Sequence, residues 1–473
     1  MKKQDTLFSN TVILGAAAVL SKATVFFLMP FYTAYLTPAD FGTADVLVGT
    51  ALLLLPFVSL NVPEAIFRFL AGGGCGKKEF FSSGVFLLTV GISAFFILIP
   101  LTAYSSLLFA YRGYLFFYVI ASLSRSFLAH ILRAEGNYML YAAQQVLCTL
   151  LTVLLQIFLL AVLRKDASGY LLGVILADAT VFFCLLLFLR PWRYFSVFDI
   201  RWAIIKKILR YSLPLMPTAV LWWVTAVSDR YILLHYHGTQ VTGLYAAASR
   251  IPTVLTFLIG VFLEAWQYAA IGTREQARAP RYGHIYSLLL PVAIMGAASV
   301  LSIAYPLVLL IYAPEYSGAV AFIPFLTLAA LFSALSSFLG SIYVVKLKTV
   351  ASLLTALCGA LLNVAFNILL IPRFGGIGAA FATLIAYFTV FCVRILHSRR
   401  HLRFSHHIVK FTVSVLFLWL AAFAVMREGY LIALLPAIFS PLPFSLEIWE
   451  GISLLLEKLT DIRKKRQKRT RGY

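Results

Sequence analysis

Residues 350–397 read VASLLTALCGALLNVAFNILLIPRFGGIGAAFATLIAYFTVFCVRILH. This stretch holds two apolar runs, 350–371 and 377–397, and the short segment between them carries one charge, Arg373. A helix of about 20 apolar residues is long enough to cross the roughly 30 Å hydrocarbon layer of a bilayer. Because lipid offers no hydrogen-bond partner to an exposed backbone, the two runs are predicted to be membrane-spanning α-helices.

The same pattern recurs along the whole chain of 473 residues, of which 62% are hydrophobic and 12% charged. We therefore expect an all-α polytopic membrane protein with about fourteen transmembrane helices. The last of them is doubtful because three prolines interrupt it. The predicted helices cover residues 10–35, 44–67, 83–103, 112–131, 141–163, 169–190, 211–234, 241–270, 285–312, 319–345, 350–371, 377–397, 408–426 and 430–446.

Lys and Arg indicate the orientation of these helices. The net charge of +21 is concentrated in short loops that alternate with nearly uncharged ones, which is the positive-inside pattern of a membrane protein and argues against a nucleic-acid partner. Both termini are then cytoplasmic, including the basic tail of residues 463–471, and the membrane is the cell inner membrane. An even number of helices is then required, which keeps the doubtful fourteenth helix, and twelve is the main alternative.

Three blocks carry a family resemblance. Residues 29–42 (MPFYTAYLTPADFG), 212–251 (SLPLMPTAVLWWVTAVSDRYIL through GLYAAASRI) and 363–388 (NVAFNILLIPRFGGIGAAFATLIAYF) are distinctive together. They resemble the polysaccharide transporter family, which contains the Wzx-type O-antigen flippases of the MOP flippase superfamily. A further, weaker similarity within the chain pairs Gly42 with Gly243.

This resemblance implies a MATE-like arrangement of two six-helix lobes, residues 1–200 and 201–400, around a central cavity. Residues 401–473 add two helices and a basic cytoplasmic tail. It also implies translocation of an undecaprenyl-pyrophosphate-linked oligosaccharide by alternating access, for O-antigen, capsule or exopolysaccharide assembly. The expected partners are that lipid-linked oligosaccharide, membrane lipids, and a polysaccharide polymerase or chain-length machinery.

Charged residues at membrane depth are costly and usually functional. Four are candidates for binding a pyrophosphate in a cationic cavity: Lys22, Arg68, Arg125 and Arg250. Arginine suits this task because its planar fork matches phosphate oxygens in pairs. Arg68 and Arg125 have an alternative interpretation as interfacial residues in a first helical turn. The other charges at this depth are Asp45, Glu64, Asp178, Asp229, Arg230 and Glu264.

Three of these charges are candidates for coupling or for structure. Asp178 stands alone in the middle of the sixth predicted helix, where it would bind a coupling ion, H⁺ or Na⁺, or pack as a protonated residue. Asp229 and Arg230 would either link the lobes or contact substrate. We expect no cofactor beyond the coupling ion and no metal site.

Two other functions share this composition. A drug or cation antiporter of the same superfamily would need an acidic cavity, whereas the four residues expected to line the cavity here are cations. A membrane polysaccharide polymerase or glycosyltransferase would need a sizeable outer loop with catalytic residues, and the predicted outer loops are short. A transporter that is not an enzyme is therefore favoured.

Overall fold

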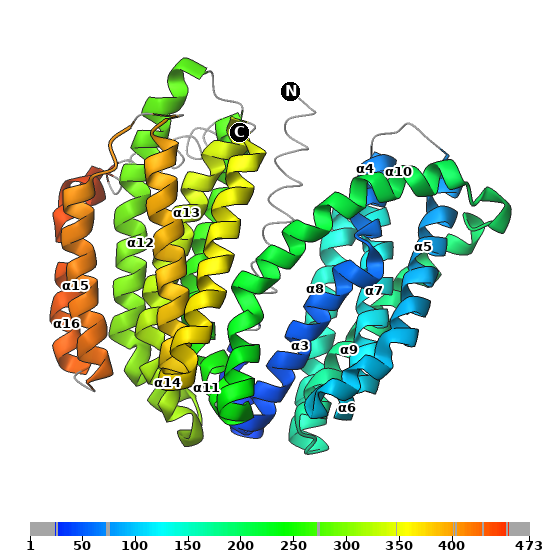
Figure 1. The fold of residues 1–473 in the computed structure, drawn as a ribbon, viewed down its shortest axis with the longest axis horizontal. Coiled ribbons are helices and arrows are strands. Elements are labelled where there is room, and N and C mark those ends of the chain that lie inside the picture. The colour runs from blue at the N-terminus through cyan, green and yellow to red at the C-terminus, as the bar shows by residue number, and fades with distance from the viewer. Residues whose placement is uncertain are drawn as a thin grey trace, which may run out of the picture. The chain divides into compact units, whose positions relative to one another are not determined.

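The computed structural model describes residues 27–71, 76–271, 275–346, 348–400, 404–427 and 430–450, together with residues 24, 402 and 453. Every regular element in these ranges is helical (Figure 1). Eleven of the helices are long and apolar enough to cross a membrane. The prediction of an all-α, multi-pass membrane protein is thus confirmed. Most of the first predicted helix, and the basic tail, lie outside the described residues.

Two of the eleven helices each contain a pair of predicted spans. α11 (Met216–Ile271) and α14 (Thr349–Ser398) are interrupted at Gly238, with φ 76°, and at Gly375, with φ 54°. Positive φ is accessible to glycine at little cost, which explains glycine at both turns. Each interruption falls where the sequence predicted a tight loop, so the described residues contain thirteen apolar helical segments.

The chain forms two compact units. The first comprises residues up to 247 with 312–316 and 364–376, and the second comprises 248–311, 317–363 and the residues from 377 onward. The lobe boundaries expected at residues 200 and 400 stay a prediction, because packing and internal symmetry need not divide a helical bundle at the same residues.

The first unit is built around α3 and the three helices α7, α8 and α9. Thr37 caps α3 by accepting a hydrogen bond from the Asp40 amide, and Pro38 occupies the first turn, where no amide donor is needed. The helices of this unit are α2 (Met29–Tyr35), α3 (Pro38–Ser59), α4 (Val62–Ala71), α5 (Lys77–Leu98), α6 (Ser106–Ala110), α7 (Arg112–Ala134), α8 (Tyr138–Ile157), α9 (Ala167–Leu189) and α10 (Trp202–Ser212), followed by the first part of α11.

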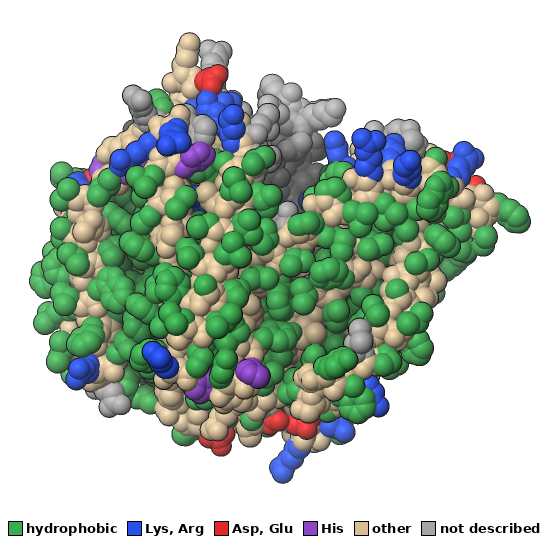
Figure 2. All heavy atoms as spheres, in the orientation of Figure 1, with side chains coloured by type: hydrophobic (Ala, Val, Ile, Leu, Met, Phe, Trp, Pro, Cys, Tyr) green, Lys and Arg blue, Asp and Glu red, His purple; other side chains and the backbone are tan. Residues whose placement is uncertain are grey.

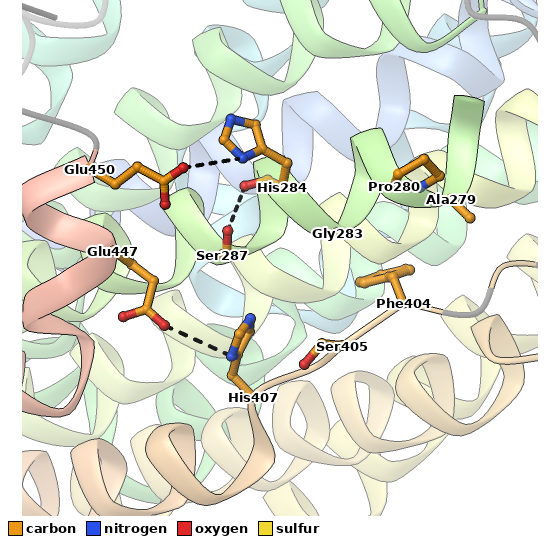
Figure 3. Close-up of a pocket in the computed structure, with 10 residues that line it drawn as sticks. All are labelled: Ala279, Pro280, Gly283, His284, Ser287, Phe404, Ser405, His407, Glu447 and Glu450. Carbon is orange, nitrogen blue, oxygen red and sulfur yellow. Dashed lines mark hydrogen bonds and ion pairs between the residues drawn. The ribbon is translucent and has the colours of Figure 1, made fainter. Parts of the chain in front are cut away.

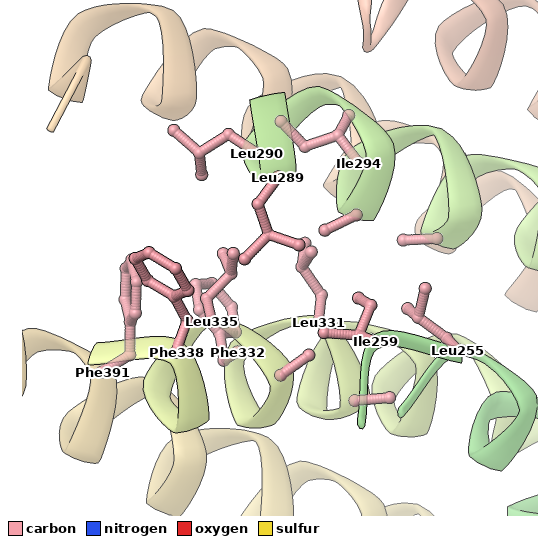
Figure 4. Packing of buried hydrophobic residues seen from close by; sticks show 14 of the residues in the cluster. Leu255, Ile259, Leu289, Leu290, Ile294, Leu331, Phe332, Leu335, Phe338 and Phe391 are labelled. Carbon is pink, nitrogen blue, oxygen red and sulfur yellow. The ribbon is translucent and has the colours of Figure 1, made fainter. Parts of the chain in front are cut away.

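The second unit contains the remainder of α11, the parts of α14 on either side of residues 364–376, and four more helices. These are α12 (Glu275–Ile311), α13 (Ile323–Val345), α15 (Ile408–Met426) and α16 (Tyr430–Phe439). Its core is formed by leucine, isoleucine and phenylalanine side chains that interdigitate between α11, α12 and α13 (Figure 4). Leu290, Leu331 and Phe338 are fully buried there.

Several predicted boundaries were wrong. The helix expected over residues 44–67 is two helices, because Leu60 and Asn61 adopt left-handed conformations between α3 and α4. α5 begins about two turns earlier than predicted and α12 nearly three turns earlier, since polar first turns continue a helix beyond the apolar run. The doubtful last helix is present as α16, and residues 431–450 qualify as a span despite their prolines.

Basic side chains gather at one end of each unit. On the first unit they lie over α4 and α10 (Figure 2), where Lys206, Lys207 and Arg210 follow one another along an amphipathic helix. Hydrophobic side chains cover the flanks of the helices below them. This separation is the one that a bilayer imposes on a multi-pass protein.

Candidate functional site

A buried ionic cluster joins α3 to α11 within the first unit. Arg230 donates from Nε to Asp45 Oδ2 at 2.5 Å and from Nη1 to Asp229 Oδ1 at 3.0 Å. Tyr245, which follows the turn at Gly238, donates its hydroxyl to Asp229 Oδ2 at 2.5 Å. The side chains of Asp45 and Asp229 are only 8% and 5% exposed. Two carboxylates therefore share one guanidinium in a place that water hardly reaches.

Two glycines allow the same elements to approach closely. A Cβ atom on Gly42 would lie 2.2 Å from the Thr239 carbonyl oxygen, and one on Gly243 would lie 1.7 Å from the Pro38 carbonyl oxygen. The start of α3 therefore packs backbone to backbone on α11. Gly42 and Gly243, which the sequence paired as a weak internal repeat, are neighbours in space.

Farther along α3, polar contacts continue this seam. Trp223 donates its indole N–H to the Gly49 carbonyl at 2.7 Å, and the Thr50 and Tyr231 hydroxyls form a hydrogen bond. The polar atom of Trp223 thus holds α11 against α3. The seam thus combines close backbone packing, a shared guanidinium and side-chain hydrogen bonds.

A second ionic cluster lies between α7, α8 and α9. Arg125 donates from Nε to Asp178 Oδ1 at 2.6 Å and from Nη1 to Gln144 Oε1 at 3.1 Å. The Asp178 carboxylate also accepts hydrogen bonds from the Ser122 hydroxyl and, at 3.1 Å, from the Cys148 thiol. Two residues predicted separately, one as a phosphate-binding cation and the other as an ion-coupling acid, are therefore partners.

The remaining predicted cations are placed differently. Arg68 is exposed in the last turn of α4, and Arg250 is half-buried in the part of α11 that belongs to the second unit. Lys22 lies outside the described residues. The structure thus brings together Arg125 with Asp178, and Asp229 with Arg230 and Asp45, but it places neither Arg68 nor Arg250 in these two clusters.

The comparisons with known proteins identify the family. Residues 7–267, more than half of the chain, match the family described as "polysaccharide biosynthesis protein". The chain belongs to this family. The resemblance seen in the three sequence blocks is thereby confirmed.

Solved structures place this polysaccharide biosynthesis protein in the MOP fold. It is similar to the lipid II flippase MurJ in an inward closed conformation, with a TM-score of 0.70, 15% identity, and coverage of 93% of this chain and 99% of that one. It is also similar to an outward-facing multidrug resistance transporter of the MATE family, with a TM-score of 0.57, 15% identity and coverage of 83% and 94%. At this identity the likeness concerns the fold.

A sequence relative is known from Methanocaldococcus jannaschii. It is an uncharacterised membrane protein, 30% identical over 193 residues, which are 35% of this chain. The chain covers 37% of the length of that relative. Its description adds no activity.

Sequence reasoning missed a half-buried cation within the membrane-spanning part of the chain. Arg394 lies near the end of the predicted helix 377–397 but was not among the candidate residues; within α14 it donates to the Ser336 carbonyl at 2.7 Å and to the Thr355 hydroxyl at 3.1 Å. A Cβ atom on Gly340 would lie 2.7 Å from its Nη1 atom. The signal available in the sequence was a single arginine near the end of an apolar run.

Neutral polar residues were also missed. Gln144, Ser122 and Cys148 complete the coordination of the Arg125–Asp178 pair. Nothing in their spacing distinguished them from ordinary residues of an apolar helix. Only the packing of three helices shows that they surround a charge.

Proposed function

We propose that this protein translocates an undecaprenyl-pyrophosphate-linked oligosaccharide across the cell inner membrane by alternating access, without chemical change, for O-antigen, capsule or exopolysaccharide assembly. The observation that carries the proposal is membership of the polysaccharide biosynthesis family by a chain with the fold of a lipid II flippase. A lipid-linked glycan is the substrate class that agrees both with the description of the family and with the fold.

The proposal assigns the pyrophosphate to fixed cations. Moving a doubly charged headgroup through the membrane requires groups that replace its lost hydration, and guanidinium groups do so with paired hydrogen bonds. Lys22, Arg68, Arg125 and Arg250 are the proposed contributors. The exposure of Arg68 supports its availability to a ligand.

The ion pair between Arg125 and Asp178 suggests how transport is coupled to an ion. Its Nε atom is already bonded to Asp178, so a phosphate would have to compete with that carboxylate. We assign Asp178 the coupling proton: protonation cancels its charge, weakens its hold on Arg125, and frees the guanidinium for the substrate. The Asp45–Arg230–Asp229 cluster is assigned the structural task of holding α11 to α3.

Complementation tests the function. The gene is expressed in bacteria that lack their O-antigen flippase and make a simple repeat unit, and surface glycan is measured at equal protein level. Wild type should restore glycan, Lys22→Ala and Arg250→Ala should lose most of it, and the exposed loop control Arg164→Ala should retain it.

The outcomes separate function from site. Restoration that survives both substitutions would support the flippase and overturn the cation assignment. Failure of wild type across several donor glycans, with the protein correctly inserted, would overturn the flippase proposal and turn attention to drug export or to glycan polymerisation.

A further inference from the structure

In the first unit, the segment that joins α9 to α10 is held against the start of α5. The Ser82 hydroxyl donates to the Tyr194 carbonyl at 3.3 Å and accepts from the Ser196 amide at 3.0 Å. The Ser83 hydroxyl accepts from the Arg201 amide at 3.4 Å. Both serines are fully buried. The backbone of this segment is therefore fixed on α5.

Large apolar side chains on this fixed segment are exposed. Phe198 is 97% exposed, and Trp202, the first residue of α10, is 74% exposed. Trp192, Phe195 and Val197 are exposed as well. Exposed apolar side chains that gather in one stretch mark a contact with another molecule or with a membrane.

The exposed apolar surface is continuous with that of a membrane span. α9 is long and apolar enough to cross a bilayer, and its last two turns expose Phe183, Leu187 and Phe188. The exposed aromatic residues of the segment follow within a few positions of its end at Leu189. Aromatic side chains at the end of a span are typical of the boundary between hydrocarbon and headgroups. This continuity favours lipid over a soluble protein as the occupant.

α10 adds a basic face to this surface. Its isoleucines are buried against the unit, whereas Lys206, Lys207 and Arg210 are exposed. Trp202, Lys206 and Arg210 are spaced four residues apart, so they share one face of the helix. Among the described residues none of the three cations forms an ion pair. Lys207 Nζ lies instead 4.9 Å from the centre of the Phe69 ring.

Neighbouring elements do not cancel this charge. α4 contributes one cation and one acid, and the first turn of α5 contributes two lysines and Glu79. Glu79 Oε1 lies 2.8 Å from Nη2 of Arg201, so these two charges are paired. Lys77 likewise forms an ion pair with Glu135 at the end of α7. The three cations of α10 therefore keep their charge available to a ligand.

The second unit differs at its own basic end. Glu447 and Glu450 line a hollow there, each opposite a histidine (Figure 3). Glu447 also accepts a hydrogen bond from Lys410 Nζ at 2.6 Å. Acids and cations are thus mixed in that hollow, whereas α10 contains no acid. The charge of α10 selects an anionic ligand, and that of the hollow does not.

We propose that α10 and the preceding segment 190–201 form a binding surface for anionic phospholipids of the surrounding membrane. The exposed aromatic side chains insert at the boundary between hydrocarbon and headgroups, and the exposed cations of α10 bind the lipid phosphates. A zwitterionic phospholipid is held less well, because its own ammonium group meets the same cations.

Lipid retention by the purified full-length protein tests this inference independently of transport. The detergent-solubilised protein is incubated with an equimolar mixture of phosphatidylglycerol and phosphatidylcholine of identical acyl chains, and bound lipids are counted by native mass spectrometry. Wild type should retain phosphatidylglycerol in preference to phosphatidylcholine. Lys206→Gln/Lys207→Gln/Arg210→Gln should lower this preference, by roughly fivefold for each cation removed from an anionic headgroup.

A matched triple variant separates this surface from total charge. Arg112→Gln/Arg164→Gln/Lys165→Gln removes the same charge from exposed positions of the first unit that lie outside the surface, and it should keep the preference. An equal loss in both triple variants, or an unchanged preference in the α10 variant, would overturn the proposal.

Fluorescence quenching tests the insertion of the aromatic side chains. The emission of Trp202 is obtained in lipid vesicles as the difference between wild type and Trp202→Phe. Phosphatidylglycerol brominated at the headgroup end of its acyl chains should quench this emission, and the water-soluble quencher acrylamide should not. Quenching by acrylamide alone would place Trp202 in water, where a soluble partner would bind, and would rule out the lipid surface.

Discussion

The guanidinium Nε of Arg230 lies 2.5 Å from Oδ2 of Asp45, although the two residues are 185 positions apart in the sequence. This pair connects the first half of α11 to the first half of α3, and Asp229 shares the same guanidinium. Because the side chains of Arg230 and Asp45 are almost fully buried, the pair fixes the register of α11 against α3 and is not a surface ion pair.

Replacing Arg230 by a neutral residue should lower the free energy of unfolding. Arg230→Gln leaves two buried carboxylates without their guanidinium, and breaking a buried ion pair in this way costs roughly 3–5 kcal/mol. Thermal unfolding in detergent should show a clear loss of stability. The double variant Asp45→Asn/Arg230→Gln should recover part of it, because one of the two uncompensated charges is then absent. Arg112→Gln, at an exposed position, is the control. Equal melting temperatures of Arg230→Gln and Arg112→Gln would contradict the expectation.

A methyl group should disturb the glycine seam. Gly243→Ala places Cβ against the Pro38 carbonyl, and backbone on both sides must move, at a cost of about 1–3 kcal/mol. Surface glycan in the complementation assay should fall with it. Gly260→Ala is the matched control, because the same change in α11 there meets nothing within 4 Å and alanine favours a helix. A harmless Gly243→Ala would show that the seam is loose.

Asp178 should control the pH response of transport. Asp178→Asn preserves the size of the side chain but removes the charge that holds Arg125, so the protein should resemble the permanently protonated state. Flipping of a lipid-linked glycan in vesicles with an imposed pH gradient should then lose its dependence on that gradient.

The control for this measurement is Asp166→Asn. Asp166 caps α9 by accepting a hydrogen bond from the Ser168 amide at 2.8 Å, and asparagine caps a helix about as well. It should keep the wild-type pH response. An Asp178→Asn protein that still responds to the gradient would place the coupling ion elsewhere.

His406 should make stability depend on pH. Burial lowers the pKa of His406 from its ordinary value of 6.5, and the neighbouring charges of Arg399 and His407 lower it further. The unfolded chain therefore binds a proton that the folded chain rejects, so stability should be complete above pH 6.5 and should fall as the pH drops below it. Melting temperatures at pH 7.5 and 5.5 measure the effect.

Substitution identifies the source of that dependence. His406→Gln should flatten the difference between the two pH values, although it also removes a ring that stacks on Phe404 at 4.4 Å. His235→Gln, at an exposed position, should leave the difference unchanged. If both variants keep the wild-type response, other groups produce it.

The helical, multi-pass character of the protein was readable from the sequence because the bilayer imposes one rule on every span. An apolar run such as 350–371 must be helical whatever it packs against. Tight turns were readable for a similar local reason: Gly238 and Gly375 lie where the chain reverses with positive φ. Charge at membrane depth likewise drew attention to Arg125, Asp178, Asp229 and Arg230 in advance.

Only the tertiary structure shows which of those charged residues form ion pairs. Pairing of Arg125 with Asp178 depends on how α7, α8 and α9 rotate about their axes, and an apolar helix that is buried on several faces carries little periodicity to reveal that rotation. The approach of Gly42 to Gly243 likewise requires two distant segments to meet. The sequence determined which charged side chains lie at membrane depth, where burying a charge is unfavourable. Only the packing of the helices determined which of these charges form ion pairs with one another.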